Sequence, residues 1–333
     1  MRLPIALIGA GRIGRIHGAN VRADHRIALR YIVDPDGEAA AELSGVTGAK
    51  AVSLNEALDD KELAGVVIAS ATHTHADLIE RIAGLGIPIF CEKPLDLSTT
   101  RAQACVDAVT KNDIPFVIGF NRRYDPDFVR LHALVRDGVL GNVESIQIIS
   151  RDPSPPSLDY IRASGGLFRD MAIHDFDVAR WLLGEEPDEV SASGSSIVDP
   201  AIGEAGDIDT ALITLRTPGG RLCSISNSRR TSYGYDQRVE VHGSLRTARV
   251  ENQPETQLLI SGDEGSTGSR NKHFFHDRYA EAYRMEMRHF VSVIMGNETP
   301  RTTVLDGLRA LELADAAAQA LKEKRTIQVR YVR

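Results

Sequence analysis

The stretch that decides the fold is Leu3-Pro4-Ile5-Ala6-Leu7-Ile8-Gly9-Ala10-Gly11-Arg12-Ile13-Gly14. Its first half is an apolar run of strand length, and its second half matches the pattern G-x-G-x-x-G and opens a helical stretch. In such a strand–turn–helix unit, Gly9 permits the tight turn, Gly11 lets the main chain approach a pyrophosphate, and Gly14 lets helix and strand pack closely. The N–H groups at the start of the helix then favour a phosphate. The alternative is a glycine turn without a ligand.

Asp34 lies twenty residues after Gly14, at the end of a second apolar run, Ile27–Val33. A carboxylate at this place accepts hydrogen bonds from the hydroxyls of an adenosine ribose. The next residues, Pro35 and Asp36, bring no basic group for a 2′-phosphate, and Asp34 itself repels one. The pattern therefore favours NAD over NADP.

Apolar runs of strand length alternate with helical stretches over the first 120 residues. The predicted strands are Leu3–Ile8, Ile27–Val33, Gly65–Ala69, Ile87–Cys91 and Phe116–Gly119, and helical stretches include Asn55–Leu58, Ala76–Leu85 and Ser98–Lys111. This alternation predicts a parallel sheet with helices on both faces.

Polar residues follow these strands, and ligands of such sheets bind at the carboxyl ends of the strands. His73 and His75 in one of these segments suggest a metal pair, but no third ligand at a familiar spacing accompanies them, so we favour a loop or cofactor contact and expect no metal. The residues expected to contact the cofactor are Gly9, Gly11, Arg12, Ile13, Gly14, Asp34, Ser70, Ala71, Thr72, His75, Glu92, Lys93, Asn121 and Arg122.

After residue 121 strand-like runs follow one another, which predicts a largely antiparallel sheet. These runs are Val143–Ser150, Glu189–Gly194, Thr210–Arg216, Arg221–Asn227, Arg238–His242 and Gln257–Ser261, with a turn at Thr217–Gly220 and helices near Asp170–Leu183, Tyr279–Met295 and Leu305–Lys322. We therefore expect two domains, residues 1–121 and 122–333.

One predicted helix of the second half combines polar and apolar faces. At about 100° per residue, the residues on its polar stripe are Asp170, His174, Asp177 and Trp181, and those on the opposite side are Ala172, Phe176, Ala179 and Leu183. Gly184 can end the helix as its C-cap. A carboxylate and an imidazole on a mostly buried helix have three readings: a structural hydrogen-bonded pair, two ligands of a metal ion, or groups that transfer protons in catalysis. The third reading is favoured, because alcohol oxidation needs a group that accepts a hydroxyl proton near neutral pH.

The composition argues against several classes of protein. A net charge of -7 disfavours binding to nucleic acid or an anionic membrane surface. The three cysteines show no CxxC spacing, so a disulfide framework is not expected and a reducing, cytoplasmic compartment fits better. No apolar run reaches the roughly 18 residues that span a bilayer, and the start of the chain does not read as a signal peptide.

Several motifs resemble the Gfo/Idh/MocA oxidoreductases, and especially their inositol 2-dehydrogenase branch. They cover the chain from the Gly9–Gly14 turn onward and are Glu92-Lys93-Pro94, Gly119-Phe120-Asn121-Arg122-Arg123-Tyr124-Asp125, Arg151-Asp152-Pro153, Gly165–Gly184, Ser228–Asp236, Arg278-Tyr279 and Ala282-Tyr283. The resemblance implies an α/β chain: an N-terminal Rossmann domain with a doubly wound parallel sheet, then a C-terminal α+β domain with an open, mainly antiparallel sheet. It also implies that this second sheet mediates oligomerisation, often into homotetramers.

The resemblance further assigns roles at matching positions. Lys93 would hydrogen-bond the reacting hydroxyl, His174 would remove its proton, and Asp170 would orient His174 or the substrate. The residues implied to contact substrate are Lys93, Arg122, Asp152, Asp170, His174, Tyr233 and Tyr279. The implied reaction is NAD-dependent oxidation of myo- or scyllo-inositol to the ketone. Two alternatives stay open: an aldose or another cyclic polyol as the substrate, and a regulator that binds NAD without catalysis.

Overall fold

The computed structural model describes residues 2–332, and internal contacts group the chain into two units. Unit 1 consists of Met1–Tyr124 and Ala282–Arg309, and unit 2 consists of Asp125–Glu281 and Ala310–Arg333. Unit 1 thus takes a segment, Ala282–Arg309, that the predicted division at residue 121 assigns to the second domain. That segment carries apolar side chains of the unit 1 core, among them Met287, Phe290 and Val291.

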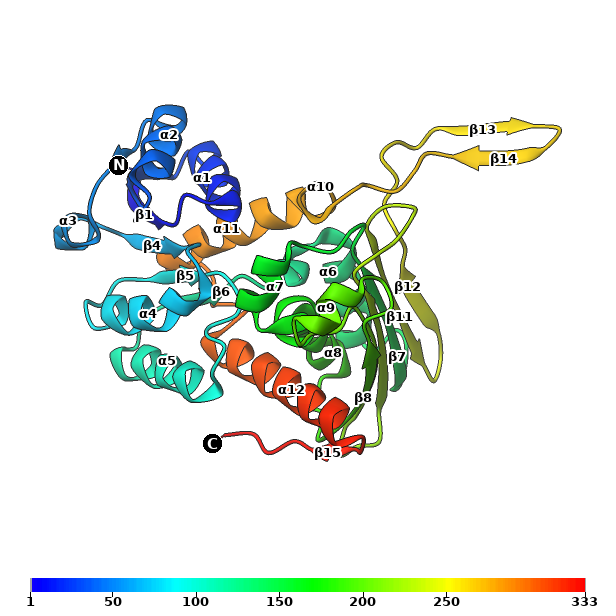
Figure 1. Ribbon diagram of the computed structural model, residues 1–333. Coiled ribbons are helices and arrows are strands. Elements are labelled where there is room, and N and C mark those ends of the chain that lie inside the picture. Colours follow the sequence, from blue (N-terminus) through cyan, green and yellow to red (C-terminus); the bar gives the residue numbers. More distant parts are fainter. Residues whose placement is uncertain (1, 333) are drawn as a thin grey trace. The chain divides into compact units, whose positions relative to one another are not determined.

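Unit 1 is built on a six-stranded parallel sheet of order β3-β2-β1-β4-β5-β6 (Figure 1). Its strands are β1 (Leu3–Ile8), β2 (Ile27–Val33), β3 (Lys50–Ala51), β4 (Gly65–Ile68), β5 (Ile89–Cys91) and β6 (Phe116–Ile118). β4 and β5 are buried at every position, as expected for a parallel sheet that is covered on both faces. The parallel sheet predicted from the alternating pattern is confirmed.

The helices of unit 1 follow the strands in alternation. They are α1 (Arg12–Ala23), α2 (Gly37–Thr47), α3 (Leu54–Asp59), η1 (Thr72–Thr74), α4 (His75–Ala83), α5 (Thr99–Asn112) and η2 (Asn121–Tyr124), with most of α11 (Ala280–Ile294) and the first turns of α12 (Val304–Glu323) from the later segment. The three helical stretches predicted between the strands correspond to α3, α4 and α5. In each of α2 and α3, a side chain before the first turn accepts main-chain N–H bonds, Asp36 in one and Ser53 in the other.

Unit 2 is built on a seven-stranded sheet of order β12-β11-β7-β10-β9-β8-β15. Its strands are β7 (Val143–Arg151), β8 (Glu189–Ser195), β9 (Thr210–Arg216), β10 (Leu222–Ser228), β11 (Asp236–Gly243), β12 (Thr247–Val250) and β15 (Ile327–Gln328). The pair β10 and β7 is parallel and the other pairs are antiparallel. The prediction of a mainly antiparallel sheet is confirmed.

The helices of unit 2 pack on one face of this sheet, where α8 contacts β7. They are α6 (Pro126–Arg136), α7 (Leu158–Ser164), η3 (Phe168–Ala172), α8 (Ile173–Leu183), α9 (Pro200–Glu204) and α10 (Phe275–Arg278), followed at the end of the chain by the remainder of α12. As predicted, α8 ends at Gly184, which has φ 64° and donates its N–H to the Arg180 carbonyl. Strands β9 and β10 alternate buried and exposed residues, so the face of the sheet away from α8 is exposed.

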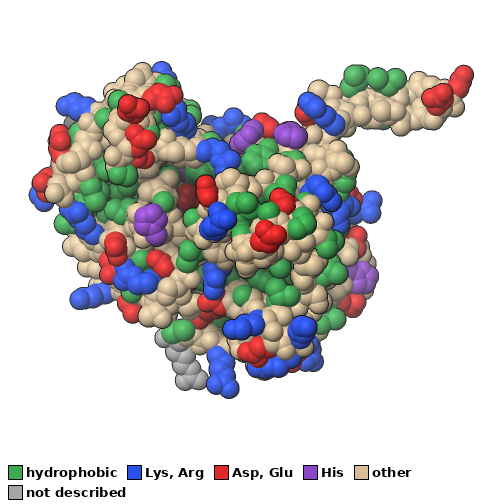
Figure 2. Space-filling model, viewed as in Figure 1, with side chains coloured by type: hydrophobic (Ala, Val, Ile, Leu, Met, Phe, Trp, Pro, Cys, Tyr) green, Lys and Arg blue, Asp and Glu red, His purple; other side chains and the backbone are tan. Residues whose placement is uncertain are grey.

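The predicted strand Gln257–Ser261 does not join this sheet. The chain instead forms a separate hairpin of β13 (Leu259–Gly262) and β14 (Gly265–Gly268), which projects from unit 2 (Figure 1). Every residue of both strands is exposed, since no layer of unit 2 covers either face of the hairpin. Figure 2 shows hydrophobic side chains along this arm and acidic side chains near its tip. The apolar pattern identified a strand but not its partner.

All three cysteines are free and buried. Burial raises the pKa of the Cys91 and Cys223 thiols well above the ordinary value. Among residues 2–332, no helix combines the length and apolar character needed to cross a membrane.

Candidate functional site

The turn after β1 has the backbone geometry of a dinucleotide site. Gly9 has φ 106°, and a Cβ there would lie 2.4 Å from the Ala69 carbonyl oxygen. A Cβ on Gly14 would lie 2.0 Å from the carbonyl oxygen of Gly9. At Gly11, by contrast, a Cβ would meet no heavy atom of the described chain within 4 Å. The first and third glycines are therefore required by packing, and the second leaves open space where a pyrophosphate can approach.

Asp34 is fixed beside this turn by main-chain donors. The Ala10 N–H donates to Asp34 Oδ2 at 2.6 Å, and the Asp36 N–H donates to Asp34 Oδ1 at 2.8 Å. Helix α1 begins next to it with an exposed Arg12 and a half-buried Ile13. The N–H groups at the start of α1 and the Asp34 carboxylate form a donor and acceptor set that fits the pyrophosphate and ribose of NAD.

The loop after β4 carries the predicted residues Ser70, Ala71, Thr72 and His75. Ser70 and Thr74 join their hydroxyls at 2.7 Å, while Ala71 stays exposed. His75 is buried, with Nδ1 2.8 Å from the Pro94 carbonyl oxygen and Nε2 3.1 Å from the Ser70 carbonyl oxygen. Desolvation lowers its pKa, although both carbonyl contacts oppose that shift. His75 therefore ties the loop after β4 to the loop after β5.

Glu92, Lys93 and Pro94 follow β5 directly. Lys93 is half-buried, and its main-chain N–H donates to Glu92 Oε2 at 3.3 Å. Asn121 and Arg122 follow β6 in η2 and are both buried. The structure thus brings the predicted cofactor residues of unit 1 to the carboxyl ends of β1, β2, β4, β5 and β6, the edge at which parallel sheets bind ligands.

In unit 2, the predicted catalytic helix begins with a π-helical turn, Phe168–Ala172, which precedes the α-helical part. Gly165 and Gly166 lead into it with φ 82° and 84°, and a Cβ on Gly166 would lie 2.7 Å from Asp207 Oδ1. The same Asp207 oxygen accepts the Leu167 N–H at 3.0 Å. The glycine pair is needed for this turn, and π turns are frequent at functional sites.

Asp170 lies in the π turn and is held by two side chains. The Tyr160 hydroxyl donates to Asp170 Oδ1 at 2.8 Å, and Arg229 Nη1 donates to Oδ2 at 3.2 Å. Arg229, 1% exposed, also contacts Asp207 Oδ2 at 3.5 Å. The buried Arg229 guanidinium thus bridges the Asp170 and Asp207 side chains with charge-assisted hydrogen bonds. Asp170 is therefore oriented by Arg229 and Tyr160.

His174 is a half-buried residue in a helix whose residues 171–180 are otherwise buried. Of the predicted polar stripe, Asp170, His174 and Trp181 are half-buried, and Asp177 is 1% exposed and lies 3.7 Å from Arg180. The wider π turn changes the angle between Asp170 and the rest of the helix, so a single α-helical wheel does not fix the direction of Asp170 relative to His174. The predicted apolar side, Ala172, Phe176, Ala179 and Leu183, is buried.

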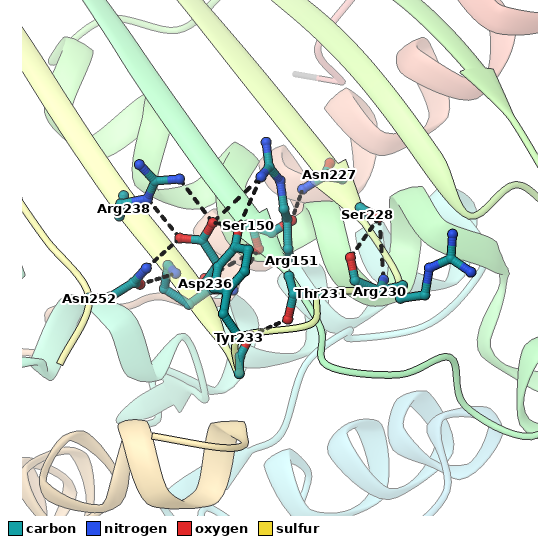
Figure 3. A network of polar contacts seen from close by, with 12 residues as sticks. Ser150, Arg151, Asn227, Ser228, Arg230, Thr231, Tyr233, Asp236, Arg238 and Asn252 are labelled. Carbon is teal, nitrogen blue, oxygen red and sulfur yellow. Dashed lines mark hydrogen bonds and ion pairs between the residues drawn. The ribbon is translucent and has the colours of Figure 1, made fainter. Parts of the chain in front are cut away.

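Tyr233, a predicted substrate residue, belongs to the polar network of Figure 3. Its hydroxyl donates to Asp236 Oδ2 at 2.7 Å and accepts from Arg151 Nη1 at 3.0 Å. Burial favours a raised pKa for Asp236, but hydrogen bonds from Arg238, Asn252 and Tyr233 outweigh it and hold that pKa below its ordinary value. The ionised Asp236 fixes the Tyr233 hydroxyl.

A buried polar chain runs beneath the same strands. Asn227 Nδ2 donates to Asp175 Oδ2 at 2.7 Å, next to His174 on α8. Gln237 Nε2 donates to the Ser150 hydroxyl at 3.0 Å, and the Tyr279 hydroxyl donates to Gln237 Oε1 at 3.5 Å. Asp152, the last predicted substrate residue, follows β7 and donates its N–H to the Ser228 carbonyl. The strands β7, β10 and β11 thus hold Asp175, Tyr233, Tyr279 and Asp152 by hydrogen bonds.

Sequence reasoning assigned no role to Arg229, Asp207 or Tyr160. Arg229 lies within the Ser228–Asp236 motif quoted above. A second indication in the sequence was that this charged residue directly follows a predicted strand. The contact between Arg229 and Asp170 joins residues 59 apart in the chain, so no local spacing reveals it.

Two family models match the chain. Residues 3–120 match the oxidoreductase family with an NAD-binding Rossmann fold, and residues 128–249 match the GFO/IDH/MocA C-terminal domain. Together they cover the six strands of the parallel sheet and most strands of the seven-stranded sheet, and they agree with the NAD-type turn of unit 1.

Curated relatives and solved structures resemble the chain along almost its full length. The inositol 2-dehydrogenase of Rhizobium meliloti (strain 1021) is 44% identical over 99% of this chain and 100% of the relative, and the myo-inositol 2-dehydrogenase of Thermotoga maritima is 41% identical over 98% and 99%. A myo-inositol dehydrogenase structure from Corynebacterium glutamicum has a TM-score of 0.95 at 40% identity and covers 100% of both chains. A scyllo-inositol dehydrogenase from Lactobacillus casei, solved with NAD(H) and scyllo-inositol, has a TM-score of 0.92 at 26% identity, covering 98% of this chain and 99% of that one. The chain therefore belongs to the GFO/IDH/MocA family of NAD-binding oxidoreductases.

Proposed function

We propose that the protein is an NAD-dependent dehydrogenase that oxidises one ring hydroxyl of an inositol, myo- or scyllo-inositol, to the ketone. The observation that carries this proposal is a helix with His174 and with an Asp170 that Arg229 and Tyr160 orient, in a chain that also has the dinucleotide turn. The relatives named inositol 2-dehydrogenase, at 41–44% identity over nearly the whole length, support the choice of substrate.

The residues of unit 1 fit NAD through groups that are already in place. The N–H groups at the start of α1 would bind the pyrophosphate across the open space at Gly11, and Asp34 would accept hydrogen bonds from the ribose hydroxyls. Arg12, Ile13, Ser70, Ala71, Thr72, Asn121 and Arg122 would line the remainder of the site. His75 would act indirectly, because its ring nitrogens already contact the Ser70 and Pro94 carbonyls. When bound, NAD supplies the hydride acceptor.

Three side chains would handle the substrate hydroxyl. Lys93 would donate a hydrogen bond to its oxygen and stabilise the negative charge that develops there. His174 would accept the hydroxyl proton, since imidazole titrates near neutral pH. Asp170 would orient the imidazole or the substrate, and its own position is fixed by Arg229 and Tyr160.

The remaining hydroxyls of the ring would be recognised by Arg122, Asp152, Tyr233 and Tyr279. Inositols and pyranoses present similar rings of equatorial hydroxyls, so an aldose or another cyclic polyol is the second candidate substrate. A regulator that binds NAD without catalysis is the remote alternative, and the combination of Lys93, Asp170 and His174 argues against it.

The test is NADH formation, followed by its absorbance, over a panel of myo-inositol, scyllo-inositol, other inositol isomers and aldoses. We expect kcat/KM to be highest for an inositol, and turnover to be lost in His174→Ala. A higher kcat/KM for an aldose would transfer the assignment to the second candidate. Tight NAD binding without turnover of any polyol would favour the regulator.

The proposal includes a homotetramer in the cytoplasm. Two observations on unit 2 support assembly: the exposed face of the seven-stranded sheet carries Leu212 and Leu222, which are 63% and 50% exposed, and the projecting hairpin exposes Leu258, Leu259 and Ile260. Apolar residues gathered on one exposed face are typical of protein interfaces. Leu212→Glu with Leu222→Glu should lower the mass measured by light scattering, whereas Leu245→Glu, at a 74% exposed turn residue, should leave it unchanged. A monomeric wild-type protein would contradict the tetramer.

The cytoplasmic location in this proposal is supported by the three buried free cysteines, which fit a reducing compartment.

A further inference from the structure

Three titratable side chains meet in the interior of unit 1, away from solvent. His17 comes from α1, Glu92 follows β5, and Glu286 comes from α11. Nitrogen and carboxylate oxygen atoms of the three lie within 4.8 Å of one another. The site proposed above assigns no function to His17 or Glu286.

Glu92 is the centre of this cluster. Its Oε1 lies 2.7 Å from His17 Nε2, and its Oε2 accepts the main-chain N–H of Lys93 at 3.3 Å. Gly119 leaves room for the carboxylate, because a Cβ there would lie 3.0 Å from Glu92 Oε2. The position of the Glu92 carboxylate is therefore linked to the main chain of Lys93.

Glu286 faces this carboxylate from inside the protein. Its side chain is 0% exposed, and neither of its carboxyl oxygens has a hydrogen-bond partner within residues 2–332. Burial raises the pKa of Glu286 well above its ordinary value, and the nearby Glu92 carboxylate raises it further. A buried carboxylate without a donor is very unfavourable, and two facing carboxylates are rarely both ionised.

A metal ion would be another way to stabilise such a cluster, but the distances disfavour it. Two ligands on a tetrahedral zinc ion with bonds of about 2.0–2.1 Å lie roughly 3.3 Å apart. The 2.7 Å contact between His17 Nε2 and Glu92 Oε1 is instead an ordinary length for a hydrogen bond to a charged acceptor. This contact therefore fits a direct hydrogen bond between the His17 imidazole and the Glu92 carboxyl group.

We propose that Glu286 is a neutral carboxylic acid in the folded protein and that its neutrality positions the Glu92 side chain, and thereby the main chain at Lys93. With Glu286 uncharged, the Glu92 carboxylate keeps its contacts to His17 and to the Lys93 N–H. An ionised Glu286 would repel it from that place. Glu286 is then a positioning residue. Only the importance of Lys93 for turnover rests on the proposed function; the protonation of Glu286 does not.

The proposal has a consequence for stability against pH. The titratable groups near Glu286 are His17 on α1, Glu92 after β5 and Tyr124 in η2, and the ring of Tyr283, on the same helix as Glu286, contacts His17. Because the pKa of Glu286 is raised on folding, the unfolded chain releases this proton first as pH rises. The folded state is therefore destabilised progressively above the unfolded pKa, until pH passes the folded pKa.

Glu286→Gln, which keeps the shape and removes the proton equilibrium, tests this on the whole protein. In infrared spectra at pH 8, the wild type should show the C=O stretch of a protonated carboxyl that Glu286→Gln lacks. The midpoint of thermal unfolding of Glu286→Gln, relative to wild type, should rise by about 3 °C or more between pH 6 and pH 8.

Glu298→Gln is the matched control from the same unit. Burial favours a raised pKa for Glu298, but hydrogen bonds from His289 and Arg301 outweigh it and lower that pKa. Glu298→Gln should therefore destabilise the protein at pH 6 and at pH 8 alike, without the rise expected for Glu286→Gln. Positioning is read from hydrogen exchange at the Lys93 amide, which should be about 10-fold faster in Glu286→Ala and close to wild type in Glu286→Gln.

The outcomes are distinguishable from failure of the proposed function, because none of these measurements needs a substrate. An absent carboxyl band, or a stoichiometric metal ion in the purified wild type, would overturn the neutral Glu286. Equal exchange at Lys93 in the wild type, Glu286→Ala and Glu286→Gln would overturn its positioning role.

Discussion

The cofactor edge of unit 1 and the polar helix of unit 2 hold their functional groups in different ways. At the cofactor edge, the decisive groups are main-chain atoms of a glycine turn, and even Asp34 is held by main-chain N–H groups. On the helix, the decisive groups are the side chains of Asp170 and His174, and Asp170 is held by the side chains of Tyr160 and Arg229. The glycine turn tolerates few substitutions, because an added Cβ would clash with neighbouring main-chain atoms. The side-chain network instead fails when one of its members loses its charge.

The largest expected effect is on turnover, and it separates the two regions. His174→Ala and Lys93→Ala should each lower kcat by ~10²–10⁴-fold, as is usual for positioned acid–base groups, while NAD affinity stays near the wild-type value. Steady-state kinetics and NAD titration measure both. His25→Ala, at an exposed histidine of unit 1, is the control. Wild-type turnover in either variant would remove that residue from the proposed mechanism.

Arg229→Ala should have the next largest effect, because it leaves Asp170 and Asp207 without their shared cation. We expect a fall of roughly 3 kcal/mol in the free energy of unfolding of unit 2, as for a broken buried ion pair, together with a lower kcat. Denaturant unfolding and kinetics measure the two effects. Arg230→Ala, at the adjacent exposed position, should be near neutral. Equal stability of the two variants would show that Arg229 does not support Asp170.

Gly14→Ala tests the main-chain side of the comparison. The new Cβ would lie 2.0 Å from the Gly9 carbonyl oxygen, so the turn must shift. We expect the free energy of unfolding to fall by about 2 kcal/mol or more, and the affinity for NAD to fall with it. Gly45→Ala is the matched control, since its Cβ would meet no atom of the described chain within 4 Å and lies in the interior of α2. The free energy of unfolding of that variant should increase by roughly 0.5–1 kcal/mol. Unchanged NAD affinity in Gly14→Ala would detach the turn from cofactor binding.

Asp34→Ala should have the smallest effect, a change of about tenfold in the preference for NAD over NADP, equivalent to about 1.4 kcal/mol. The ratio of kcat/KM for the two cofactors measures it. Asp36→Ala removes the cap of α2 and should lower stability without altering that ratio. If both variants keep the wild-type ratio, the ribose role of Asp34 is wrong.

The same contrast explains what could be predicted from the sequence. Gly9, Gly11, Gly14 and Asp34 act through local spacing, so the turn, its strand and its sheet were predictable from the chain alone. The π turn was not, because a single helical period cannot show where the helix widens, and it changes the direction of Asp170 relative to His174. The supporting contact of Arg229 to Asp170 and the approach of Glu286 to Glu92 join distant segments, which only the folded chain brings together.

The division of unit 1 between two stretches of sequence affects how the protein is made. Its core requires side chains of α11, such as Phe290 and Val291, which the ribosome synthesises only after all of Asp125–Glu281. At about 5–20 residues per second, the roughly 160 intervening residues delay the completion of this core by roughly 8–30 s. During that interval the nascent Rossmann sheet lacks part of its apolar cover, so chaperone binding to the growing chain should be strongest before α11 emerges.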